Sequence, residues 1–133
     1  MPTRWPALLT LPLLCLLLLG ADCNDEVTEI DDVGRLHAME QSILNYARQP
    51  DCGGEGDCRF IGMGVNPCGG PYYYLIYSTS AVDSVELVGM VEEYNEFNDE
   101  LNARYGWAGP CVVPNPPVLD CVEGTCVDVG YDH

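Results

Sequence analysis

The chain has 133 residues and a formal net charge of −16 at pH 7, because 21 acidic residues stand against five arginines and no lysine. Phosphate binding needs a basic patch, so the composition argues against nucleic acid and against anionic membrane surfaces as partners. The carboxylates can steer a cationic ligand or a basic protein to the surface. They are spread along the chain, however, which favours a role in solubility.

Residues 1–22 are predicted to be a secretory signal peptide. Arg4 precedes a leucine-rich apolar run over residues 7–19, and the small residues Gly20 and Ala21 follow it. The run is shorter than the roughly 20 residues that a membrane-spanning helix needs, which disfavours the alternative of a retained membrane anchor. Cleavage would leave a chain long enough for one domain.

Cys23 directly follows the leader and makes the number of remaining cysteines odd. Residues 19–23, LGADC, resemble a bacterial lipoprotein processing site, although Asp22 stands where a small residue is usual. A lipid on Cys23 would tether the protein to a membrane and leave an even set of cysteines. The alternatives are a disulfide within the chain, a disulfide between two molecules, or a free thiol. Residues 23–32 are acidic and polar, and we expect a flexible spacer.

A first helix is predicted over residues 33–49, where apolar side chains recur at helical spacing. Asp31 or Asp32 can cap its start, and Pro50 ends it. The following stretch, residues 51–57, is rich in glycine and aspartate and is predicted to be a loop.

Two strands are predicted next, over residues 58–65 and 72–78. The Pro- and Gly-rich connection between them, residues 66–71, is short and indicates an antiparallel pair.

The second strand carries four tyrosines: Tyr72, Tyr73, Tyr74 and Tyr77. Strand alternation puts Tyr72 and Tyr74 on one face and the other two on the opposite face. One face must point away from a covering helix, so some of these rings form a candidate binding patch unless a second helix covers that face as well.

A second helix is predicted over residues 83–105, with Asp83 or Ser80 as its cap and Gly106 at its end. The prolines within residues 109–117 favour an extended course. A hairpin is then expected around Glu123-Gly124, between strands over 118–122 and 125–129.

These elements predict a single α+β domain over residues 33–133. A small, mainly antiparallel sheet packs against the helix at 83–105, and disulfides stabilise it.

Six cysteines follow the predicted spacer: Cys52, Cys58, Cys68, Cys111, Cys121 and Cys126. Their spacings differ from those of zinc knuckles and no histidine lies near them, so disulfides are favoured over a metal. Six cysteines allow 15 pairings. Cys121 and Cys126 would face each other across the hairpin and could bond there. Alternatively, one of them reaches back to Cys111, Cys68 or Cys58.

No catalytic site is predicted. His37 and His133 neighbour no candidate nucleophile, and neighbouring carboxylates are expected by chance in so acidic a chain. No metal or cofactor is expected. The loop at 51–57 is the segment nearest to a calcium loop, but it lacks the alternating ligands.

Several strings of this chain resemble those of small exported, cysteine-rich bacterial proteins: CRFI from Cys58, PCGGP from Pro67, YLIYS from Tyr74, the pair Tyr94-Asn95, and CVEGTC from Cys121. The similarity covers roughly residues 50–129. It implies export and disulfides, and it carries over no activity and no functional residue.

Together these features predict a non-enzymatic exported domain of the cell envelope that acts by binding or by structural support. The expected location is the periplasm, the outer envelope or the extracellular space, and the expected partner is a protein or a small ligand. The alternative is an extracellular protease inhibitor that uses the Pro-rich loop between Cys111 and Cys121. A hydrolase with carboxylate chemistry is the least favoured hypothesis.

Overall fold

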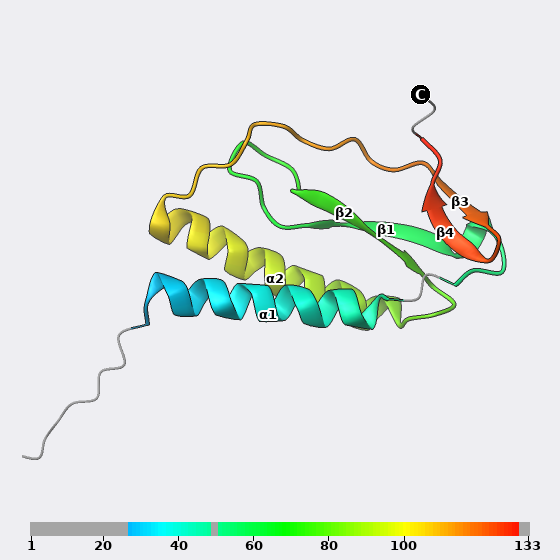
Figure 1. Ribbon diagram of the computed structural model, residues 1–133, viewed down its shortest axis with the longest axis horizontal. Coiled ribbons are helices and arrows are strands. Elements are labelled where there is room, and N and C mark those ends of the chain that lie inside the picture. The colour runs from blue at the N-terminus through cyan, green and yellow to red at the C-terminus, as the bar shows by residue number, and fades with distance from the viewer. Residues whose placement is uncertain (1–26, 49–50, 131–133) are drawn as a thin grey trace, which may run out of the picture.

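The computed structural model describes residues 27–48 and 51–130, and within them it has two α-helices, one short 3-10 helix (η1, Glu55–Asp57) and four strands. The predicted α+β class is confirmed. The helices α1 and α2 lie side by side, the ribbon β1–β2 lies against them, and the hairpin β3–β4 closes one end of that ribbon (Figure 1).

Helix α1, Glu29–Tyr46, begins earlier than predicted. Thr28 caps it in a capping box, because its side chain accepts from the Asp31 N–H while the Asp31 carboxylate accepts from the Thr28 N–H. Residues 29–32, predicted to belong to the spacer, therefore form the first turn of the helix. The prediction that Asp31 or Asp32 caps the start was wrong by one turn.

Helix α2, Ser84–Tyr105, agrees with its prediction to within one residue. The Asp83 carboxylate accepts hydrogen bonds from the N–H groups of Val85 and Glu86. Gly106 ends the helix in the left-handed conformation with φ of 63°, which glycine adopts without steric cost.

The described strands form two separate antiparallel ribbons, and not the single sheet that was predicted. Strand β1, Cys58–Met63, pairs with β2, Tyr73–Ser78, while β3, Leu119–Val122, pairs with β4, Thr125–Asp128. The chain that leads from α2 into β3, residues 110–118, is rich in proline, which lacks the N–H that a sheet ladder requires.

The core lies between the helices and the inner face of the β1–β2 ribbon, and its buried members are Ile43, Ala47, Met63, Tyr77, Leu87, Val91 and Tyr94. Helix α1 contributes Ile43, which is 1% exposed. Both helices therefore cover the sheet, whereas the prediction gave this role to the second helix.

Three asparagines of α2 pair with the backbone at the end of β1 and just past it. The Asn95 side chain accepts from the Gly64 N–H at 2.7 Å and donates to the Gly62 carbonyl at 3.1 Å. Asn98 accepts from the Val65 N–H at 2.7 Å, and Asn102 donates to the Val65 carbonyl at 2.7 Å. These amides satisfy backbone groups that no neighbouring strand reaches in the described chain.

The start of α1 and the end of α2 are joined through Asp32, which is 4% exposed. Its carboxylate accepts from the Arg104 guanidinium and, at 2.7 Å, from the Tyr105 hydroxyl. Trp107 stacks on Tyr105 and donates its indole N–H to Glu29 at 2.8 Å. The helix pair is thus fixed by polar contacts at its end and by apolar contacts along its length.

Candidate functional site

In the described part of the chain three disulfides join all six predicted cysteines: Cys52–Cys121, Cys58–Cys126 and Cys68–Cys111. The disulfide prediction is confirmed. Several disulfides indicate an oxidising compartment, extracellular or periplasmic.

Cys121 and Cys126 do face each other across the β3–β4 hairpin, as the sequence predicted. They are not bonded to each other, because Cys121 bonds to Cys52 in the loop before β1 and Cys126 bonds to Cys58, the first residue of β1. The bond of Cys126 to Cys58 was among the predicted alternatives, whereas the partner of Cys121, Cys52, was not.

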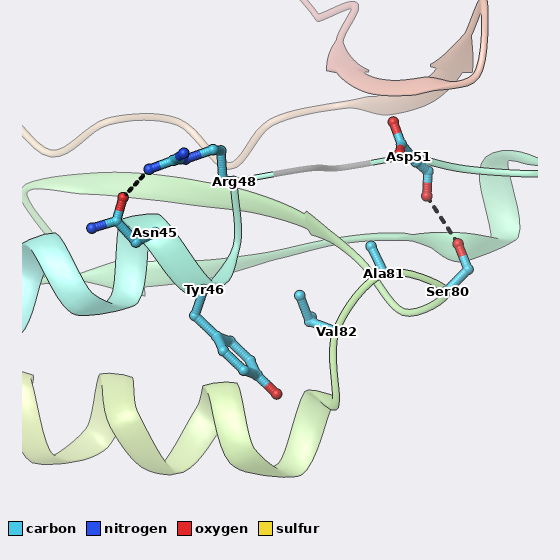
Figure 2. A pocket seen from close by; sticks show the side chains of 7 residues that line it. All are labelled: Asn45, Tyr46, Arg48, Asp51, Ser80, Ala81 and Val82. Atoms are coloured by element: carbon cyan, nitrogen blue, oxygen red, sulfur yellow. Dashed lines mark hydrogen bonds between the residues drawn. The ribbon is translucent and has the colours of Figure 1, made fainter.

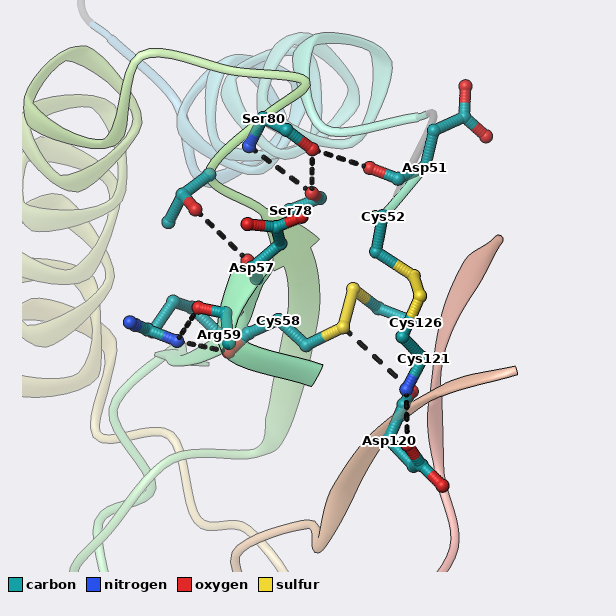
Figure 3. Close-up of a disulfide and its surroundings, with 12 residues drawn as sticks. Asp51, Cys52, Asp57, Cys58, Arg59, Ser78, Ser80, Asp120, Cys121 and Cys126 are labelled. Carbon is teal, nitrogen blue, oxygen red and sulfur yellow. Dashed lines mark hydrogen bonds between the residues drawn. A yellow bond between two sulfur atoms is a disulfide. The ribbon is translucent and has the colours of Figure 1, made fainter. Parts of the chain in front are cut away.

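Two of the disulfides lie next to each other between the loop and the hairpin (Figure 3). The Sγ atoms of Cys52, Cys58 and Cys126 lie within 4.8 Å of one another, and Cys121 is bonded to the first of these. Cys58 and Cys126 are each 4% exposed. The hairpin also holds the loop without sulfur, since the Cys52 N–H donates to the Gly124 carbonyl at 2.8 Å.

Before the hairpin in the sequence, residues 112–118 form an extended and largely exposed segment that crosses from α2 towards β3 (Figure 1). The Cys68–Cys111 bond anchors its first end. The buried Asn66 side chain reinforces this anchor, because it donates to the Pro110 carbonyl at 3.0 Å and accepts from the Cys68 N–H at 3.0 Å.

The second end of the segment is anchored as firmly. The Val118 N–H donates to the Asp128 carboxylate at 3.0 Å, and the Val118 carbonyl accepts from the Val129 N–H at 2.8 Å. The Cys52–Cys121 bond follows three residues later. The segment therefore has two covalent anchors and is stiffened by prolines between them.

The segment lies beside the outer face of the β1–β2 ribbon. Tyr74 and Ile76 of β2 line a small pocket of about 160 Å³ with Pro114 and Pro117 of the segment. Phe60 of β1 is 39% exposed and meets Tyr74 edge to face, with ring centroids 5.2 Å apart. This face carries apolar side chains that no helix covers in the described chain.

The four tyrosines of the predicted patch do not lie on one surface. Tyr77 belongs to the core and Tyr73 packs against it, so the helices cover that face. The Tyr73 hydroxyl donates to Glu40 at 2.7 Å, and burial together with this bond raises the pKa of Tyr73. Tyr74 lies on the outer face beside Phe60, whereas Tyr72, 38% exposed, packs its ring against Gly64 and Gly109 before the start of β2.

A pocket of about 430 Å³ lies between the end of α1 and the turn after β2 (Figure 2). Its polar groups pair with their neighbours. Arg48 donates to Asn45, the Ser80 hydroxyl donates to the Asp51 carbonyl at 2.9 Å, and Tyr46 donates to Glu86. The pocket therefore presents few polar groups with which to select a ligand.

The other residues considered in the sequence lie apart from this surface or outside the described part of the chain. His37 is exposed on α1 and lies 3.9 Å from Glu40. In the loop once compared with a calcium site, the Asp57 carboxylate accepts from the Gly53 N–H at 2.8 Å. Cys23 and His133 lie outside the described residues.

Sequence reasoning missed the asparagines that organise this site. Asn66 stands directly before Pro67 in a stretch rich in turn residues, which is a usual place for a side chain that bonds its own backbone. Asn95, Asn98 and Asn102 recur at helical spacing on the second helix. That polar stripe beside the apolar stripe was the available signal.

None of the described helices is long and apolar enough to pass through a bilayer. Comparison of the chain with protein-family models, with curated proteins and with solved structures finds no match.

Proposed function

We propose that this chain is an exported, non-enzymatic module that binds a partner on its outer face. The binding surface comprises the exposed segment 112–118 and the adjoining ribbon side chains Phe60, Tyr74 and Ile76. The proposal depends on one observation above all, which is that both ends of the segment are fixed by disulfides while Val112 is 72% and Val118 is 59% exposed.

The fixed shape of the segment favours its use in binding. A surface that is already ordered loses little conformational entropy when it binds, so more of the contact energy appears as affinity. Exposed apolar side chains at fixed positions are costly in water and gain free energy when a partner covers them. The net charge of −16 adds selection, because it repels acidic partners and attracts basic ones.

Site-specific photocrosslinking in the envelope of the producing cell tests this proposal. A photoreactive residue at Val112 should give an adduct with a distinct partner. The same residue at Glu96, on the exposed face of α2, serves as the matched control. Identical adducts from both positions, or no adduct from Val112, would contradict the assignment.

Export and anchoring form a separate part of the proposal. We propose cleavage of the leader before Cys23 and a lipid on that cysteine, with the residues between Cys23 and Thr28 as the tether. The intact mass of the mature protein tests both points. A chain that begins elsewhere, or that carries an unmodified Cys23, would rule out the lipid anchor.

Protease inhibition is a second candidate function, and the same segment favours it. An inhibitor loop must present an extended backbone that stays rigid in the active site, and residues 112–118 are extended and tied at both ends. Val112 would enter a specificity pocket for aliphatic side chains. Slowed hydrolysis by a serine protease of that specificity, lost in Val112→Asp, would support this function, whereas a full panel without inhibition would exclude it.

A further inference from the structure

The two neighbouring disulfides bring three of their four sulfur atoms close together, and this has a chemical consequence apart from partner binding. In a tetrahedral zinc site with four thiolates, Zn–S bonds of about 2.3 Å place the sulfurs about 3.8 Å apart. The Sγ atoms of Cys52, Cys58 and Cys126 already lie within 4.8 Å of one another. The Cys121 sulfur lies outside this group of three, but it is bonded to that of Cys52 and is therefore the candidate fourth ligand.

We propose that Cys52, Cys58, Cys121 and Cys126 bind one Zn²⁺ ion as a tetrathiolate site once both disulfides are reduced. Four thiolates are the ligand set of structural zinc sites, and soft sulfur ligands favour zinc over the hard cations. The oxidised protein would then be the metal-free form, and the same four side chains would cross-link the fold in either state.

Reduction of the two disulfides and binding of the ion need only a dithiol and Zn²⁺ as reactants. Two molecules of a dithiol each transfer two electrons and two protons to one protein disulfide and become disulfides themselves. The four thiols formed lose four protons as they bind the ion, which stays Zn²⁺ throughout.

Contacts other than the sulfur bonds hold these cysteines in place. The antiparallel pairing of β3 with β4 sets Cys121 opposite Cys126. The loop is tied to the same hairpin by the bond from the Cys52 N–H to the Gly124 carbonyl and by a β-bridge between Asp51 and Thr125. None of these contacts is a sulfur bond, so in the folded, metal-bound form they would keep the four thiolates near one another.

Burial separates these cysteines from the third pair. Cys58 and Cys126 are 4% exposed, which shields a bound ion from water and competing ligands. Cys68 and Cys111 are both exposed, and Cys68 follows the end of β1 whereas Cys58 begins that strand. The third disulfide therefore supplies a matched control.

The test uses two variants with equal numbers of cysteines, both in a Cys23→Ser background of the mature chain. C68A/C111A keeps the four clustered cysteines, while C58A/C126A keeps four that are not clustered. After reduction and titration with Co²⁺, C68A/C111A should bind one ion and show the intense visible bands of tetrahedral thiolate cobalt, which Zn²⁺ then removes. C58A/C126A should not show those bands.

A second readout names the ligands. In the reduced chain with all six cysteines, Zn²⁺ should slow alkylation of Cys52, Cys58, Cys121 and Cys126 by at least roughly tenfold and leave the other two unchanged. Equal alkylation of all six, equal cobalt spectra for the two variants, or a reduced chain that stays unfolded with zinc present would each overturn the proposal.

Discussion

The asparagines of α2 allow a sharp test of what holds the sheet against the helices. Asn98 is 4% exposed, and its side chain is the partner of the Val65 N–H. The variant Asn98→Ala leaves that N–H without an acceptor, which costs about 1–3 kcal/mol, and the better helix propensity of alanine returns about 0.5 kcal/mol. We expect a net loss of about 1.5 kcal/mol in the free energy of unfolding.

The three positions should differ in a defined order. Asn95→Ala removes an acceptor and a donor at once and should cost at least as much as Asn98→Ala, about 2–3 kcal/mol. Asn102→Ala should cost about 1 kcal/mol or less, because it also removes a buried Oδ1 atom that has no hydrogen-bond partner in the described part of the molecule.

Urea unfolding of the oxidised variants measures these differences. An unchanged slope of the transition shows that a variant still unfolds in the same way. Glu96→Ala, at an exposed position of the same helix, is the control and should change stability by less than about 0.5 kcal/mol. If Asn95→Ala and Asn98→Ala were as neutral as this control, the asparagines would not be the partners that hold the edge of β1.

Two further predictions concern the disulfides and the tyrosines. The Cys52–Cys121 and Cys58–Cys126 bonds span 69 and 68 residues and close almost the same loop, so either one adds only a small ring of about 11 residues to the other. Removing either pair, as C52A/C121A or C58A/C126A, should cost about 3 kcal/mol and removing both about 7 kcal/mol in chemical unfolding; a double loss no larger than the sum of the single losses would contradict this redundancy. Stability should also fall as pH rises from about 10 to about 12. Burial raises the pKa of Tyr94 to about 12, so the unfolded chain loses its proton first, and Tyr94→Phe should flatten this decline in unfolding measured at each pH.

The sequence was most informative where a local pattern decides the structure. The period of apolar residues located both helices, and the Glu123-Gly124 pair located the hairpin turn, where both residues have positive φ. The start of α1 was misplaced because the acidic stretch 29–32 reads as a solvated linker. A capping threonine and three acids in the first turn are also what stabilises a helix start.

Features that depend on long-range proximity could not be read in the same way. Six cysteines leave 15 pairings open, and nothing local in the hairpin shows that Cys121 and Cys126 bond to cysteines 69 and 68 residues earlier. The two ribbons are separated in sequence by α2 and by a segment whose prolines cannot continue a ladder. The candidate binding face depends on this arrangement, since the segment lies beside the outer face of the two-stranded β1–β2 ribbon.

The central claim is that three disulfides with defined partners hold this domain in shape. Peptide mapping of the native protein without reduction tests it most directly. We expect three linked peptide pairs that join Cys52 to Cys121, Cys58 to Cys126 and Cys68 to Cys111. Free thiols at these six positions, or a peptide in which Cys121 is bonded to Cys126, would contradict the account.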